Sequence, residues 1–192
     1  MEGAFCSASA DVQNPDSNTG RIEDHKVNEG FDGDFSKFEE LFSNEKCVCI
    51  GEIGLDYHWG TVPKEKQQDI FRKFIRMAKQ HDLPVVIHSR DALQDTYNIL
   101  KEEKAYGVMH CYSGSSEMAK EFVKLGFKIS LAGPVTFKNA KEPKRVASEI
   151  ELKDLLIETD SPYLTPHPYR GKPNDPSYVP LVAKEIAEIK GI

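Results

Sequence analysis

Short apolar runs alternate with longer amphipathic segments along most of this chain, and this alternation restricts the possible fold more than any other feature. Strands connected by helices pair in parallel through crossovers, so the sequence predicts an α/β fold with a parallel sheet. One run, Pro84–Ile87, is continuously apolar, as expected of a strand buried on both faces. The apolar runs predict five strands, at 47–50, 84–87, 106–109, 127–131 and 155–157.

The predicted helices lie between and around these strands. Apolar residues recur at helical spacing over 63–81, which predicts the longest helix of the chain. Asp91 is expected to cap a helix that reaches about residue 103, and Ser115 or Ser116 is expected to cap the next one. Further helices are predicted after Asp34, over 144–150 and over 180–189.

Length and charge limit the function classes. The 192 residues and 39% hydrophobic content suffice for one globular domain. A formal charge of −6 argues against a protein that coats nucleic acid through many phosphate contacts. It does not exclude an enzyme that takes one nucleic-acid end into a pocket. Residues 1–30 are rich in Ser, Asp and Asn and predict a disordered or divergent leader, so the domain is assigned to 31–192.

The cysteines indicate a reducing compartment. Cys6, Cys47, Cys49 and Cys111 form no regular disulfide framework, which favours reduced thiols in a cytoplasmic protein. Cys47 and Cys49 share one face of a predicted strand, where burial is a simpler interpretation than metal binding. Neither a secretion signal nor a membrane span is predicted.

Metal-preferring side chains follow four of the apolar runs. Glu52, His88, His110 and Asp160 each stand where a predicted strand stops. In parallel α/β folds, the loops after the carboxyl ends of the strands build the active site. A single histidine at such a place is more often structural, and a single glutamate after glycine is usually a turn residue. Four such residues at successive strand ends instead favour a site for Zn, Mn, Mg or Fe.

The same stretches resemble a known family. They are Ile50-Gly51-Glu52-Ile53-Gly54-Leu55-Asp56, Pro84-Val85-Val86-Ile87-His88-Ser89-Arg90, His110-Cys111-Tyr112-Ser113-Gly114 and Glu158-Thr159-Asp160-Ser161-Pro162. In this order they are similar to the TatD family of metal-dependent deoxyribonucleases, which are amidohydrolase-like TIM barrels. The resemblance runs from about Cys47 to the C-terminus and includes Arg170-Gly171-Lys172-Pro173-Asn174.

The resemblance implies roles for these residues. Glu52 would bridge two metal ions, and His88 and His110 would complete one of the two sites. Asp160 would bind the other ion and orient or deprotonate the attacking water, which makes Glu52 and Asp160 the catalytic pair. The implied cofactors are one or two divalent ions, Mg, Mn or Zn, and the implied substrate is DNA or a nucleotide.

Three further residues are candidates for substrate phosphate. Arg170 and Asn174 lie on the loop after the last strand, and Arg90 lies two residues beyond His88. A guanidinium can grip a phosphate through two parallel hydrogen bonds. The alternatives are an ordinary loop position for Arg170 and Asn174, and for Arg90 a salt bridge to Asp91 or Asp95.

The sequence departs from the family pattern at its beginning. Family members start with a strand that carries a His-x-His pair, and this sequence contains no such pair. The five predicted strands correspond to the last five of eight, so we expect an incomplete, N-terminally truncated or divergent TIM-barrel-type fold. One of the two metal sites would then lack two imidazoles.

Two functions from different classes follow. The first is a metal-dependent hydrolase that cleaves phosphodiester bonds of DNA with a metal-activated water. The second is a catalytically weak or inactive metal-binding remnant that self-associates through exposed barrel edges. A related hydrolase acting on another ester or amide is a third possibility.

Overall fold

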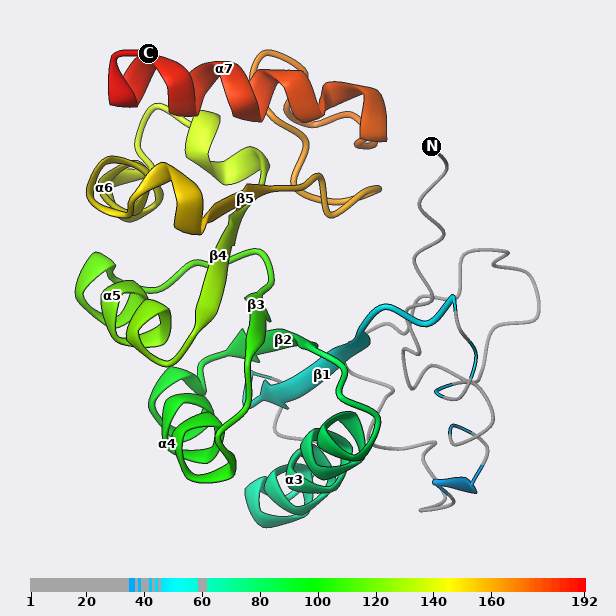
Figure 1. Ribbon diagram of the computed structural model, residues 1–192. Coiled ribbons are helices and arrows are strands. Elements are labelled where there is room, and N and C mark those ends of the chain that lie inside the picture. The colour runs from blue at the N-terminus through cyan, green and yellow to red at the C-terminus, as the bar shows by residue number, and fades with distance from the viewer. Residues whose placement is uncertain (1–34, 37, 39–41, 43, 45, 59–61) are drawn as a thin grey trace. The chain divides into compact units, whose positions relative to one another are not determined.

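The computed structural model describes residues 35, 36, 38, 42, 44, 46–58 and 62–192. Its strands are β1 (Ile50–Asp56), β2 (Val85–Arg90), β3 (Gly107–Met109), β4 (Phe127–Leu131) and β5 (Leu155–Ile157), and their order in the sheet follows the sequence (Figure 1). The predicted α/β class is therefore confirmed. The chain divides into two compact units, the first ending at Gly107 and the second beginning at Val108.

In the first unit, β1 and β2 pair in parallel from Ile53↔Ile87 to Asp56↔Arg90. Helix α3 (Lys64–Gln80) packs against β1, and α4 (Leu93–Glu103) packs against β2 and α3 (Figure 1). The apolar face predicted for the long helix is the buried one, and it contributes Phe71, Phe74, Ile75 and Ala78 to the core. Burying each of the larger side chains contributes about 1.5–3 kcal/mol to folding.

Aromatic side chains before β1 extend this core. The rings of Phe35 and Phe38 lie edge-on to Phe74, with centroids 4.9 and 5.3 Å away. The Phe42 ring contacts His81, with centroids 5.9 Å apart. Before β1, the aromatic residues Phe35, Phe38 and Phe42 therefore pack against α3 and its C-terminal end. The rest of the helix predicted after Asp34, like the predicted leader 1–30, lies outside the described residues.

The first strand was predicted too early in the chain. The apolar run 47–50 predicted a strand that leads into Gly51-Glu52, whereas β1 begins at Ile50 and continues to Asp56. Gly54 lies inside this strand, and a Cβ at its position would lie 1.9 Å from the carbonyl oxygen of His88, so its glycine allows the two strands to approach. Glu52 is consequently inside the strand and not at its end.

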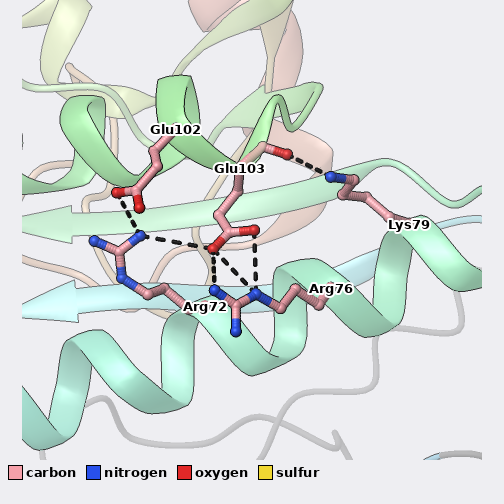
Figure 2. Close-up of polar contacts among 5 residues, drawn as sticks. All are labelled: Arg72, Arg76, Lys79, Glu102 and Glu103. Carbon is pink, nitrogen blue, oxygen red and sulfur yellow. Dashed lines mark hydrogen bonds and ion pairs between the residues drawn. The ribbon is translucent and has the colours of Figure 1, made fainter.

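Ion pairs connect α3 with α4 (Figure 2). The guanidinium of Arg76 donates to both carboxylate oxygens of Glu103, at 2.6–3.2 Å. Arg72 Nη1 lies 2.8 Å from Glu102 and 3.6 Å from Glu103. Lys79 Nζ donates to the backbone carbonyl of Glu103 at 2.7 Å, so this glutamate joins the two helices through both side chain and backbone.

In the second unit, β4 and β5 pair in parallel from Ile129↔Leu155 to Leu131↔Ile157. Helix α5 (Ser116–Lys124) packs against β4, α6 (Lys141–Glu149) lies against α5, and α7 (Val179–Lys190) packs on α6 and β5 (Figure 1). Short 3₁₀ turns occupy Gly133–Thr136, Leu152–Asp154 and Pro176–Tyr178. The core contains Phe122, Phe127, Ile129, Leu131, Val146 and Val182.

Of the helix caps predicted at Ser115 and Asp91, the structure shows the first but not the second. Ser115 caps α5 as predicted, its hydroxyl accepting from the Met118 N–H at 3.3 Å. Asp91 does not cap α4: the N-cap is Ala92, and Asp91 has a left-handed backbone with φ 53°. Its carboxylate lies 3.0 Å from Nδ1 of His58 instead. Among the described residues, no helix has both the length and the apolar character needed to cross a membrane.

Candidate metal centre

In the first unit, Glu52 lies where the β1–β2 register slips. Between Ile50 and Ile53 the strand advances three residues while its partner advances two, which is a β-bulge. A bulge turns the side chains of its strand relative to the regular pleat, and bulges are frequent beside active sites. His88 pairs with Gly54 in the register, so Glu52 and His88 belong to adjacent strands, two residues apart along the sheet.

His88 contacts a carboxylate for which the sequence predicts no role in the site. Its Nε2 lies 3.0 Å from Oδ2 of Asp56, whose other oxygen accepts from the backbone N–H of His58 at 2.9 Å. Asp56 is only 7% exposed. Burial opposes its ionisation, but the contacts with His88 and His58 and the charge of Arg90 outweigh it and hold the pKa of Asp56 below its ordinary value.

Helix α3 holds the backbone of Asp56 through Gln67. The Asp56 N–H donates to Gln67 Oε1 at 3.0 Å, and Gln67 Nε2 donates to the Asp56 carbonyl at 2.9 Å. The side-chain amide of Gln67 thus pairs with the backbone N–H and carbonyl of Asp56, as the backbone of a neighbouring strand would. Nε2 also donates to the Val62 carbonyl at 3.2 Å, and Gln67 is 3% exposed. The last residue of β1 is therefore fixed from the helix.

Arg90 ends β2 with its side chain exposed, and its carbonyl accepts from the Tyr57 N–H at 3.0 Å. The two aspartates proposed as alternative partners of Arg90 have other contacts. Asp91 lies against His58, and Asp95 accepts from the Tyr57 hydroxyl at 2.9 Å.

In the second unit, His110 directly follows β3 and lies between two carboxylates. Its Nδ1 is 2.6 Å from Oε2 of Glu158, and its Nε2 is 3.4 Å from Oδ1 of Asp160. His110 and Asp160 were both predicted as metal ligands, and the structure brings them together. Glu158, which follows β5, was not predicted to take part.

The spacing of His110 and Asp160 suits two ligands of one cation. A nitrogen and an oxygen that each bind zinc at about 2.0–2.2 Å, with a tetrahedral angle between them, lie about 3.4 Å apart. Metal-ligating histidines commonly donate their other ring N–H to a carboxylate, and Glu158 is placed for this on the opposite side of the ring. The distance between His110 Nε2 and Asp160 Oδ1 therefore suits two of the ligands that a divalent cation needs.

The surroundings of Glu158 favour its carboxylate form. Burial would raise its pKa, but the hydrogen bond and charge of His110, the Ser130 hydroxyl and the Cys111 N–H lower it below the ordinary value. The Cys111 N–H donates to Oε1 at 2.7 Å. Cys111 and Asp160 both have left-handed backbones, with φ 42° and 57°, an arrangement that is uncommon outside glycine and concentrates at functional sites.

The loop that carries Asp160 is held by Asn174. The side-chain amide of Asn174 donates to the carbonyls of Thr159 and Tyr163, both at 2.6 Å, and Asn174 Oδ1 accepts from the Asp175 N–H at 2.9 Å. Asn174 is 7% exposed. These contacts favour a role in positioning Asp160 over the phosphate contact proposed from the sequence.

Arg170 is exposed and its guanidinium lies over an aromatic ring. Its guanidinium carbon lies 4.3 Å from the centroid of Phe137, a cation–π distance. Phosphates are recognised through the N–H groups of a guanidinium. The exposed position of Arg170 is therefore compatible with phosphate binding.

Within the described residues, no group of three or more His, Cys, Asp or Glu side chains is gathered closely enough to hold a metal ion. The first unit places His88 beside the carboxylate of Asp56. The second unit places His110 between the carboxylates of Glu158 and Asp160. Sequence reasoning missed Asp56 and Glu158, although both lie inside the motifs that it used. The rule that a metal-ligating histidine is backed by a carboxylate would have been the signal to search for them.

Comparison with known proteins identifies relatives that match most of the chain. The family model for the TatD related DNase matches residues 22–192, and this match begins inside the segment predicted as a leader. The "Uncharacterized metal-dependent hydrolase YabD" of Bacillus subtilis is 56% identical over 160 residues, which are 82% of this chain and 63% of the relative. The "Uncharacterized metal-dependent hydrolase YcfH" of Escherichia coli K12 is 42% identical over 171 residues, 88% of this chain and 64% of the relative.

A solved structure supports the same relationship. The crystal structure of YjjV, a TatD homologue from Escherichia coli K12, superposes with a TM-score of 0.77 at 33% identity. The match covers 80% of this chain and 61% of that one. The TIM-barrel-type α/β fold is thus confirmed, and the chain spans less than two thirds of the length of these relatives.

Proposed function

Because this chain belongs to the TatD-related DNase family, we propose that it is a divalent-metal-dependent hydrolase that cleaves phosphodiester bonds of DNA. The observation that carries the proposal is the placement of His110 between Glu158 and Asp160, with ligand atoms spaced as one cation requires. The names of the relatives support the hydrolase class, and DNA is the substrate implied by the family. A cytoplasmic location stays a prediction.

Four residues are proposed as metal ligands: Glu52, His88, His110 and Asp160. They would hold one or two ions of Mg, Mn or Zn. Such an ion polarises a phosphoryl oxygen and lowers the pKa of water toward neutrality. Asp160 can accept a proton from the attacking water, and Asn174 keeps its loop in place for this. Arg170, and with it Arg90, would bind the phosphates of the substrate.

Hydrolysis of a fluorescent single-stranded DNA by the metal-free chain, with Mg, Mn or Zn added back separately, tests this proposal. We expect cleavage only with metal, its loss with chelator, and its loss in Asp160→Ala. Cleavage that is unchanged in Asp160→Ala would overturn the assigned chemistry. Cleavage of aryl esters or amides without cleavage of DNA would reassign the substrate within the hydrolase class.

One observation favours the second candidate, a metal-binding and self-associating protein without turnover. Strand β5 is last in the sheet order, and its Leu156 and Ile157 side chains are 42% and 43% exposed. Apolar side chains on an edge strand promote association. Sedimentation velocity over a range of concentrations distinguishes the candidates: reversible association combined with no cleavage by any metal form supports this one.

A further inference from the structure

The loop that joins β5 to α7, orange in Figure 1, carries two stacked tyrosines near its end. The rings of Tyr169 and Tyr178 have centroids 4.7 Å apart and an interplanar angle of 15°. Tyr169 is 39% exposed, and every residue from 167 to 173 is exposed as well. Aromatic rings presented to solvent in this way can stack an unpaired base of a nucleic acid, because every base has a flat face.

Contacts other than the ring stack close this loop. The Asn174 N–H donates to the Pro162 carbonyl at 2.9 Å, and the Thr165 hydroxyl donates to the carbonyl of Lys172. Thr165 and Asn174 are both buried, so these hydrogen bonds are shielded from water. The backbone that carries Tyr169 is thus fixed by buried polar groups, and its ring is left at the surface.

The charge of the loop suits a phosphate. Residues 161–174 include the cations Arg170 and Lys172 but no Asp or Glu, in a chain whose formal charge is −6. Lys172 Nζ lies 5.9 Å from the centroid of the Tyr169 ring. In a nucleotide the base and the phosphate are attached to one sugar. A ring that stacks the base, with an ammonium group beside it for the phosphate, therefore matches both parts of the nucleotide.

We propose that Tyr169, backed by Tyr178, stacks one unpaired base of the DNA substrate, and that Lys172 binds the phosphate of the same nucleotide. This inference rests on the proposed function only in taking DNA as the ligand. The side-chain amide of Asn174 donates to backbone carbonyls on both sides of Asp160, so the tyrosines and Asp160 belong to one braced loop. A base stacked on Tyr169 anchors the substrate on the loop that carries Asp160.

The test compares the binding of two fluorescent oligonucleotides to the full chain. One is a short oligothymidylate, and the other has the same length but carries abasic sugars in place of its nucleosides. Both have phosphorothioate backbones that resist hydrolysis, and both carry the same charge, so a difference in Kd measures the bases. We expect the wild type to bind the abasic oligonucleotide about 5- to 100-fold more weakly, as the loss of one stacked base predicts.

Variants assign this preference to the platform. Tyr169→Ala should lose most of the preference for bases, and Tyr169→Phe should keep it because the ring remains. Lys172→Ala should weaken the binding of both oligonucleotides equally, since they share the phosphates. Tyr106→Ala is the matched control for the ring, because Tyr106 is a tyrosine of the first unit that is 44% exposed. Lys101→Ala is the control for the ammonium group, since Lys101 Nζ lies 5.8 Å from the ring centroid of Tyr97.

The wild type alone can decide against the platform. Equal binding of the two oligonucleotides, or binding of neither, would overturn the inference even if a variant does not fold. A preference for bases that is undiminished in folded Tyr169→Ala would also overturn it. A preference that depends on Tyr169, with no hydrolysis of ordinary DNA by any metal form, would establish the platform and overturn the proposed function. Hydrolysis of DNA without any preference for bases would do the reverse.

Discussion

At the scale of single residues, the buried side chain of Asn174 stabilises the loop around Asp160 through hydrogen bonds to its backbone. Its replacement by alanine removes two hydrogen bonds to the loop around Asp160. We expect the free energy of unfolding to fall by about 1–3 kcal/mol, since each lost bond contributes about 0.5–1.5 kcal/mol. Hydrolysis should fall as well, because Asp160 loses its fixed position.

Urea unfolding followed by circular dichroism measures the free energy of unfolding of Asn174→Ala. Asn98→Ala is the control, because Asn98 makes an exposed contact with Gln94 one helical turn away. That variant should change stability by less than about 0.5 kcal/mol. Equal losses in both variants would contradict the positioning role of Asn174.

Arg170 leads to a prediction about substrate binding. Arg170→Ala removes the proposed phosphate contact, and we expect KM for DNA to rise about tenfold with a smaller change in kcat. The salt dependence of KM should become weaker, since one phosphate contact is lost. Steady-state kinetics at several salt concentrations provide the check. Arg145→Ala, which removes a guanidinium paired with Glu117 and Glu149 on the surface, should leave KM unchanged. A fall in kcat alone would contradict the assignment of Arg170.

At the scale of elements, Gly54 decides whether β1 and β2 can pair. Gly54→Ala places a Cβ 1.9 Å from the His88 carbonyl oxygen, at a backbone φ of 153°. We expect the variant to lose at least about 2 kcal/mol of stability or not to fold. Gly171→Ala shares the positive φ, at 90°, but meets no atom within 4 Å. Thermal unfolding of the two variants therefore separates steric conflict from backbone strain, and similar losses in both would contradict the close approach of the strands.

The α3–α4 ion pairs predict a response to acid. Hydrogen bonding to Arg76 lowers the pKa of Glu103; burial opposes this, while the charges of Arg76, Arg72 and Lys79 reinforce it. Because the folded pKa lies below the unfolded one, the stabilisation is present above the ordinary glutamate pKa. It is lost as the pH falls through the folded value.

Glu103→Gln should therefore flatten the decline in unfolding free energy below about pH 4.5, the region in which glutamates begin to protonate. Urea titrations at stepped pH values measure this slope. Glu102→Gln is the control, since the Glu102 side chain is 64% exposed and pairs only with Arg72 in Figure 2. An identical slope in wild type and Glu103→Gln would show that the network contributes nothing to acid stability.

The elements differ in how far the sequence could predict them. Strand β5 was predicted with its observed bounds, because an apolar run of three residues lies between Asp154 and Glu158. Strand β1 was misplaced because Gly51 and Glu52 interrupt the apolar run, and only the partner strand reveals the close approach that Gly54 permits. The expected cap at Asp91 was wrong because that residue takes a left-handed backbone.

The contacts within the candidate metal centre could not be predicted from the sequence either. Asp56 and His88 are 32 residues apart in the chain, and Cys111 donates to Glu158 across 47 residues. Such pairs depend on the register between neighbouring strands, which the apolar pattern alone does not determine. Metal-preferring residues after the apolar runs could be recognised, but their partners could not.

At the scale of the whole molecule, the proposed ligands come from both compact units, Glu52 and His88 from the first and His110 and Asp160 from the second. The most direct test is the number of zinc or manganese ions that the purified chain retains after dialysis, measured by elemental analysis for the wild type and for His88→Ala and His110→Ala. We predict one or two ions per wild-type chain and a clear loss in each variant, whereas a wild type that retains no metal, or variants that retain all of it, would contradict the account.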